Sequence, residues 1–246
     1  MEDDRYLSQV AGSIACTFRP QNAVDLAKAH EQLETLLPRD DRFMASLLLI
    51  AVEGRGLEKG VFDLEVRKAA SIVLRKEIES SWKPLLNKQK SQSEKAKSMV
   101  RDNILEGLIK CGSIEIATFL GHSVSSIISR DYPQHWATYE DTIKTILSEK
   151  TPEKLFIGFL CLHCLGRVRK YFIGPDRSTV EKTTETFLPI IVKQAKSLSD
   201  DLGRYPNVDD GILSVTHILL KNINDVILVR CALPRWICQA ALSLRM

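Results

Sequence analysis

The sequence predicts an all-α protein, a right-handed α-solenoid of about five to six HEAT-type helical hairpins. Apolar residues recur at three- and four-residue steps through most of the chain, which is the pattern of amphipathic helices. Sustained alternation of Val, Ile and Thr, the pattern of half-buried strands, does not occur. The long helices begin near residues 21, 62, 113, 153 and 209, a spacing of about 40–55 residues that is close to the ~40–47 of HEAT or armadillo repeats. Because 44% of the residues are hydrophobic and no stretch is of low complexity, we expect a single solenoid over residues 1–246.

The densest helical pattern covers residues 113–173. Its first helix is predicted to end at Asp131-Tyr132-Pro133, because proline disfavours helical angles in the residue before it. Trp136 then begins the next pattern, and we expect its ring to pack between helices. A third helix starts with Thr151 as N-cap and Pro152 at the first helical position, where no backbone N–H is needed. This helix is apolar on nearly every side for about a dozen residues, whereas a bilayer needs ~20, so we expect a buried core helix rather than a membrane insertion.

The rest of the chain is divided into helices by proline, glycine and polar stretches. Asp40 or Asp41 is expected to cap a helix that Gly54 and Gly56 close. Pro189 is expected to break or bend the helix in which it lies. The predicted helices and the one predicted mobile loop are 4–18, 23–37, 43–52, 61–82, the loop 83–95, 96–111, 179–198, 212–229 and 233–246.

Charge alone identifies no partner, and the cysteine content indicates the cellular compartment. The net charge of +3 has both signs interspersed, unlike the basic stripe of a dedicated nucleic-acid binder, so we expect no direct contact with nucleic acid. All six cysteines lie in apolar helical patterns, which predicts reduced, buried thiols in a cytosolic or nuclear protein. The start of the chain is acidic and lacks the apolar segment of a signal peptide.

Motifs for catalysis or metal binding are weak. Cys161-x-x-Cys164 with His163 lacks the second ligand pair that zinc requires, so packing is the favoured interpretation. No Gly-rich phosphate loop, HExxH or nucleophile elbow occurs in the sequence. We therefore predict no enzyme activity, no catalytic residues, no cofactor and no metal.

Four segments, in order and at matching spacing, resemble the N-terminal region of the importin-beta superfamily, the karyopherin transport receptors, and within it the branch of importins seven and eight. The resemblance extends over nearly the whole chain, and residues 20–110 are expected to form an importin-beta N-terminal-like segment within the solenoid. The matching segments are Ala27–Leu33, Val66–Ile78 closed by Trp82, Val100–Leu108, and Asp131-Tyr132-Pro133 with Trp136 and the helix Leu155–Tyr171.

The resemblance implies an outer and an inner helix in each repeat. The outer, convex helices would be 4–18, 41–53, 94–111, 136–149 and 178–199, and the inner, concave helices 21–37, 62–81, 113–130, 153–172 and 209–224. In this family the N-terminal inner helices hold the GTP form of the small GTPase Ran. The expected function is that of a transport receptor fragment or short paralogue, in cytoplasm, nucleus and nuclear pore, with cargo protein and Phe-Gly nucleoporins as further partners.

Candidate contact residues follow from the second inner helix of the family, which usually reads Leu-Lys-Asn where this chain has Leu74-Arg75-Lys76. Arg75 keeps the positive charge for an acidic GTPase surface, so it is the first candidate, with Lys76 beside it. The further Ran-binding candidates share a polar stripe on the third inner helix: His122, Ser126 and Arg130.

Without the resemblance, the favoured interpretation of Arg75 and Lys76 is an ordinary solvated helix face. The alternative function is then a non-enzymatic HEAT-repeat scaffold for protein assembly. A HEAT-repeat regulator of an enzyme is a third hypothesis.

Overall fold

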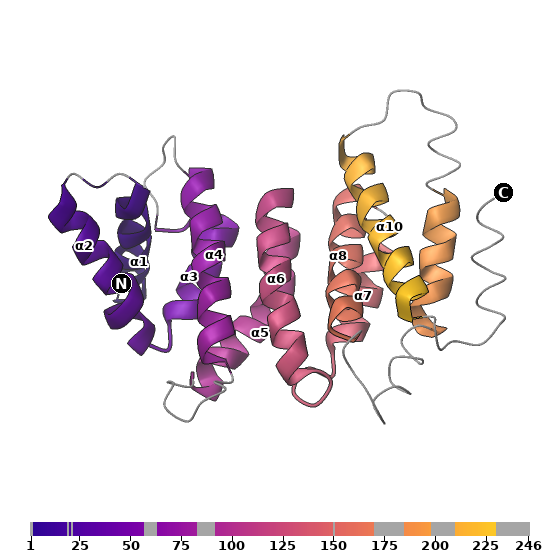
Figure 1. The fold of residues 1–246 in the computed structure, drawn as a ribbon, viewed down its shortest axis with the longest axis horizontal. Coiled ribbons are helices and arrows are strands. Elements are labelled where there is room, and N and C mark those ends of the chain that lie inside the picture. Colours follow the sequence, from indigo (N-terminus) through magenta and orange to yellow (C-terminus); the bar gives the residue numbers. More distant parts are fainter. Residues whose placement is uncertain are drawn as a thin grey trace. The chain divides into compact units, whose positions relative to one another are not determined.

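The computed structural model describes residues 2–18, 20, 22–56, 63–82, 92–149, 151–169, 185–197 and 210–229 (Figure 1). Within these ranges the chain is helical and contains no strand, which confirms the all-α prediction. The helices are α1 (Glu2–Phe18), α2 (Ala23–Glu31), α3 (Phe43–Glu53), α4 (Asp63–Ser81), α5 (Glu94–Lys110), α6 (Ile114–Asp131), α7 (Tyr139–Ser148), α8 (Pro152–Arg169), a helix at 185–197, and α10 (Asp210–Val229). Most of the predicted loop 83–95 and all of the predicted helix 233–246 lie outside the described residues.

The chain divides into two compact units, Met1–Ala137 and Thr138–Met246. Each is built of helices that pack side by side, the architecture of a helical-repeat solenoid. The single solenoid expected over residues 1–246 stays a prediction.

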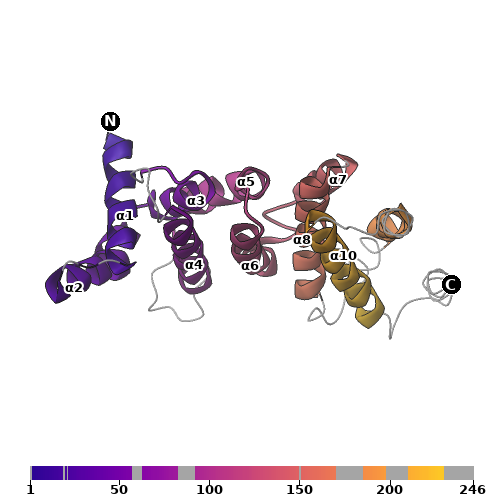
Figure 2. The same cartoon turned by 90° about the horizontal axis from the view of Figure 1, so that it is seen from above.

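The N-terminal unit has two layers of helices. Helices α3 and α5 pack together in one layer, and α4 and α6 pack together in the other (Figure 2). Helix α3 also packs on α4, and α5 on α6. The backbones of α3 and α5 approach closely at Gly107, where an added Cβ would lie 2.9 Å from Val52 Cγ2. The layers agree with the predicted grouping of 62–81 with 113–130 and of 41–53 with 94–111.

Several helices begin or end at the residues that the sequence predicted. Gly54 adopts the left-handed conformation (φ 65°), which glycine tolerates best, and its N–H donates to the Ile50 carbonyl at the end of α3. Thr151 Oγ1 accepts a hydrogen bond from Lys154 N–H at the start of α8. The predicted cap of α3 is wrong, because Arg42 is the N-cap residue and makes no side-chain capping bond. Asp40 instead accepts from the Arg42 N–H through Oδ1 at 2.8 Å, a turn that precedes the helix.

The first predicted inner helix, 21–37, is not one regular helix. Helix α2 ends at Glu31 and continues as a π-helical turn, Gln32–Leu36, and a 3-10 turn, Leu37–Arg39. The wider turn places the Gln32 side chain against α1, where its Oε1 accepts from Ser13 Oγ at 2.6 Å. The irregular turns carry the chain past Pro38, which was expected to end the helix.

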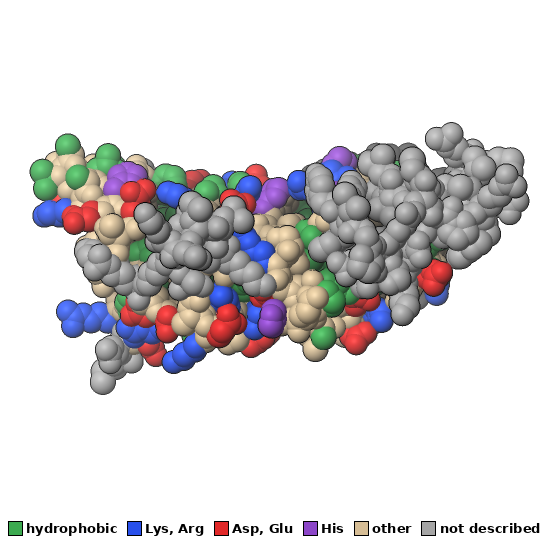
Figure 3. All heavy atoms as spheres, turned by 60° about the horizontal axis from the view of Figure 1, so that its bottom comes forward, with side chains coloured by type: hydrophobic (Ala, Val, Ile, Leu, Met, Phe, Trp, Pro, Cys, Tyr) green, Lys and Arg blue, Asp and Glu red, His purple; other side chains and the backbone are tan. Residues whose placement is uncertain are grey.

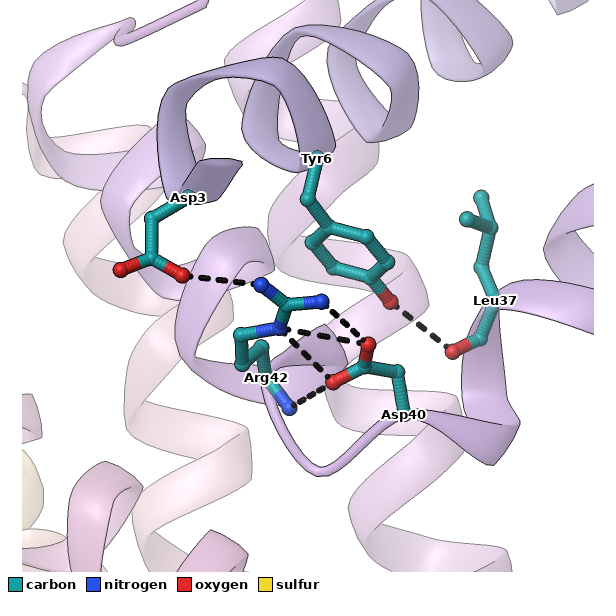
Figure 4. Close-up of polar contacts among 5 residues, drawn as sticks. All are labelled: Asp3, Tyr6, Leu37, Asp40 and Arg42. Atoms are coloured by element: carbon teal, nitrogen blue, oxygen red, sulfur yellow. Dashed lines mark hydrogen bonds and ion pairs between the residues drawn. The ribbon is translucent and has the colours of Figure 1, made fainter. Parts of the chain in front are cut away.

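A polar cluster joins α1 to the connection between α2 and α3 (Figure 4). The Arg42 guanidinium donates to both carboxylate oxygens of Asp40 and to Asp3 Oδ1, and it lies 4.6 Å from the centre of the Tyr6 ring. Tyr6 Oη donates to the Leu37 carbonyl at 3.0 Å. Hydrogen bonding by Arg42 lowers the pKa of the Asp40 carboxyl, and burial raises the pKa of Tyr6. The cluster therefore depends on an ionised Asp40.

The C-terminal unit is centred on α8, which packs on α7 and α10. Its residues 155–162 are all buried, as predicted for a core helix. Polar bonds to its backbone fix both neighbours: Tyr139 Oη of α7 donates to the Cys161 carbonyl at 2.9 Å, and Asn222 Nδ2 of α10 donates to the Phe159 carbonyl at 2.8 Å. At Gly158 an added Cβ would lie 2.5 Å from Leu147 Cδ2, so α7 and α8 are in close contact. No described helix is both long enough and apolar enough to cross a bilayer.

Three local predictions concern this unit and the end of the N-terminal unit. The helix at 185–197 continues through Pro189, so of the predicted break or bend the break is wrong, and the bend stays a prediction. Cys161 and Cys164 are buried, as expected for packing residues, and burial raises the pKa of the Cys161 thiol. Trp136, at the end of the N-terminal unit, is buried as predicted.

Candidate functional site

Helices α4 and α6 run parallel, and contacts at both ends set their register. Near the start of both helices, Lys68 of α4 forms an ion pair with Glu115 of α6. Near their ends, Arg130 of α6 donates to two carbonyls of α4, Ile78 O at 3.0 Å and Glu79 O at 2.9 Å. The middle of α4 therefore lies beside the middle of α6.

This register brings four of the five predicted contact residues to one junction. Arg75 lies about level with His122 and Ser126, since it falls between the two sets of contacts. His122, Ser126 and Arg130 follow one another at four-residue steps, so they share a face of α6. All four side chains are partly exposed. The structure thus places Arg75 next to the stripe that the sequence predicted on α6.

Lys76 lies on a different side of α4. Its Nζ is 3.4 Å from Glu34 Oε1 in the π-helical turn, and the side chain is largely exposed. Lys76 is therefore directed toward the first repeat, away from the junction of α4 with α6.

Arg75 and Arg130 are held differently. Arg75 Nε donates to Glu79 Oε1, one helical turn later, at 2.7 Å, and its side chain is 41% exposed. Arg130 binds two carbonyls in the last turn of α4, those of Ile78 and Glu79, and the Ile78 carbonyl also accepts a hydrogen bond from the Trp82 N–H. The positive charge of Arg130 also complements the negative end of the α4 dipole. Arg130 therefore has a structural role in joining two repeats.

Exposed apolar side chains lie on the same part of the surface, and the sequence did not single them out. Leu64 and Ile72 of α4 are 39% and 49% exposed, and they fall on the stripe of α4 that continues to Arg75 and Glu79. Ile114 at the start of α6 is 47% exposed, although its pattern predicted burial. A sequence signal existed for Ile72, which lies off the buried positions Val66, Ala70 and Leu74. We call this surface the α4–α6 face: Leu64, Ile72, Arg75 and Glu79 of α4 with Ile114, His122, Ser126 and Arg130 of α6.

Two further arginines connect α4 and α6 to the helices of the other layer, α3 and α5. Arg67 of α4 donates to Ala51 O at 3.0 Å, Val52 O at 2.7 Å and Cys111 O at 2.6 Å, so one guanidinium binds the ends of α3 and α5. Arg101 of α5 forms a 2.6 Å ion pair with Asp131 at the end of α6, and the two side chains are only 13% and 3% exposed. The layer of α4 and α6 is therefore held to the layer of α3 and α5 by buried polar contacts as well as by apolar packing.

The chemistry available at this surface is that of binding. Among the described residues on the N-terminal part of the molecule in Figure 3, basic and acidic side chains lie intermixed, without an extended field of one sign. Over the described part of the chain, no group of three or more His, Cys, Asp or Glu side chains is arranged to hold a metal ion. A partner of this face would have to match scattered charges and exposed apolar side chains.

Comparison with known proteins shows what this region is similar to. Residues 29–110 match the family described as the importin-beta N-terminal domain. Human Importin-8 is 27% identical over 170 residues, which is 66% of this chain and 16% of that protein. The Importin beta-like SAD2 homolog of Arabidopsis thaliana is 25% identical over 183 residues, 74% of this chain and 16% of that protein.

A solved structure supports the fold. The exportin Cse1 in its cargo-free, cytoplasmic state superimposes with a TM-score of 0.74 at 16% identity, covering 97% of this chain and 25% of that one. The chain is similar to a segment of each of these proteins and spans less than a fifth of the length of the two importins. At this identity the likeness to Cse1 concerns the fold alone, and it agrees with the predicted helical-repeat solenoid.

Proposed function

We propose, on the premise that residues 29–110 form an importin-beta N-terminal domain, that this chain acts in a transport receptor of the karyopherin type. Its work would be binding rather than catalysis, in the exchange of proteins between cytoplasm and nucleus. Cargo protein and the Phe-Gly repeats of pore proteins are the further partners of this proposal.

The GTP form of Ran is the partner proposed for the α4–α6 face. The observation that carries this is the meeting of Arg75 with His122, Ser126 and Arg130 beside exposed Ile72, within one rigidly held pair of helices. Arginine pairs well with carboxylates of an acidic surface, and a partly exposed aliphatic neighbour adds apolar contact. Lys76 would contact a partner that also reaches toward the first repeat.

A titration tests the proposal. The chain is titrated with Ran loaded with GTP or with GDP, and we expect selective binding of the GTP form. Arg75→Glu reverses a charge on the α4–α6 face, and we expect it to weaken binding by at least tenfold, since losing a charged contact at an interface costs about 2 kcal/mol or more. The matched control is Lys110→Glu, because Lys110 also pairs within its helix, with Glu106, but lies on α5 in the other layer. Equal binding of both nucleotide forms, or of neither, would contradict the transport proposal and favour a scaffold.

A further inference from the structure

The Arg75–Glu79 ion pair engages only Nε of the guanidinium among the residues that the structure describes. Glu79 accepts from Nε only, at 2.7 Å. No residue that the structure describes accepts a hydrogen bond from the two terminal nitrogens of Arg75. A guanidinium held at Nε keeps its outer pair of NH₂ groups in one plane, where they match the two oxygens of a carboxylate.

Glu79 itself is held by the neighbouring repeat. It lies in the last turn of α4, where helix ends ordinarily fray. Its carbonyl accepts from Arg130 at 2.9 Å, together with the Ile78 carbonyl at 3.0 Å, so this turn is fastened to α6. The Glu79 side chain therefore extends from a fixed backbone, and Arg75 in turn is fixed by Glu79.

We propose that Glu79 is a positioning residue, which orients the Arg75 guanidinium so that its open end receives a carboxylate of the partner. This inference rests on the proposed function, in which the partner is Ran-GTP. A long side chain that is already ordered loses less rotamer freedom on binding, and that saving corresponds to about a threefold to tenfold gain in affinity.

Glu79 could also act as a competitor of the partner, and the two roles predict opposite changes in affinity when Glu79 is removed. If Glu79 competed with the partner for Arg75, its removal would tighten binding. If it positions Arg75, its removal weakens binding, and a neutral residue that still accepts a hydrogen bond retains most of the effect. Glutamine is such a residue, because its Oε1 accepts from Arg Nε without carrying a charge.

The experiment measures the affinity of the whole 246-residue chain for Ran-GTP. We expect Glu79→Ala to weaken binding about threefold to tenfold and Glu79→Gln to stay within about twofold of wild type. Glu65→Ala is the matched control, since it removes the same charge from an exposed position in the first turn of α4 and should change affinity less than twofold. In an Arg75→Ala background, Glu79→Ala should have no further effect.

Each contrary result has a distinct meaning. Unchanged or tighter binding by Glu79→Ala overturns the positioning role, as does an effect that persists without Arg75. Circular dichroism of each variant shows whether the helices remain folded, and we expect them to, because an exposed pair within a helix contributes little stability. If the wild-type chain does not prefer Ran-GTP over Ran-GDP, the proposed function fails and the inference fails with it.

Discussion

Replacement of Arg67 tests how the N-terminal unit is held together. Arg67→Ala removes three hydrogen bonds of 2.6–3.0 Å from a charged donor to the carbonyls of Ala51, Val52 and Cys111. Each hydrogen bond to a charged group contributes about 1.5–3 kcal/mol, and carbonyls at helix ends recover part of this from water, so we expect a loss of about 3–5 kcal/mol. For a unit of this size, that loss lowers Tm by about 10–15 °C.

Thermal unfolding followed by tryptophan fluorescence measures the loss. Trp82 and Trp136 are buried in the N-terminal unit, and Trp236→Phe removes the third tryptophan from the signal. Arg67→Lys should fall between wild type and Arg67→Ala, because an ammonium lacks the planar fork that reaches separate carbonyls. Arg5→Ala, at an exposed position of α1, should shift Tm by no more than about 2 °C. If Arg67→Ala shifts Tm no more than Arg5→Ala does, the three bonds do not hold the unit together.

Three other predictions concern packing, a buried charge and pH. Gly158→Ala should destabilise the C-terminal unit by about 1–3 kcal/mol, because the added methyl group overpacks the contact with Leu147. Gly12→Ala has open space around it and should stabilise α1 by about 0.5–1 kcal/mol. Amide hydrogen exchange measures the stability of each unit separately. Arg101→Met deprives the buried Asp131 carboxylate of its guanidinium and should cost about 3 kcal/mol in urea unfolding, a loss that Asp131→Asn added to it should partly reverse. Because the pKa of Asp40 is lowered in the folded chain, its contribution to the free energy of unfolding is present above the unfolded pKa of about 3.9 and is lost as pH falls through the folded pKa. The Tm difference between wild type and Asp40→Asn should therefore shrink on acidification. A constant difference from pH 6 to pH 2 would contradict this.

The fold class and the ends of most helices were predictable from local sequence rules. Gly54 closes α3 because glycine alone reaches φ 65° without strain. The segment after Asp131 turns because Pro133 cannot continue a helix. Such signals act within a few residues, so they are readable without knowledge of the neighbours.

Features that depend on the neighbouring helix were not predictable. The π-helical turn at Gln32–Leu36 keeps the apolar spacing of a helix, and its bond to Ser13 of α1 has no sequence signal. Arg130 was predicted as a surface contact because it continues the stripe of His122 and Ser126. A polar position on a helix can face either solvent or the end of an adjacent helix, and only the register of α4 with α6 distinguishes the two.

The arginines that join neighbouring helices affect how far the sequence can change while the fold is kept. Arg67 and Arg130 recognise main-chain oxygens, which every amino acid supplies, rather than particular side chains. These hydrogen bonds therefore do not restrict which amino acids stand at positions 51, 52, 78, 79 and 111, provided that the helices still end there. Contacts of this kind constrain where the helices end more than which side chains stand at their ends.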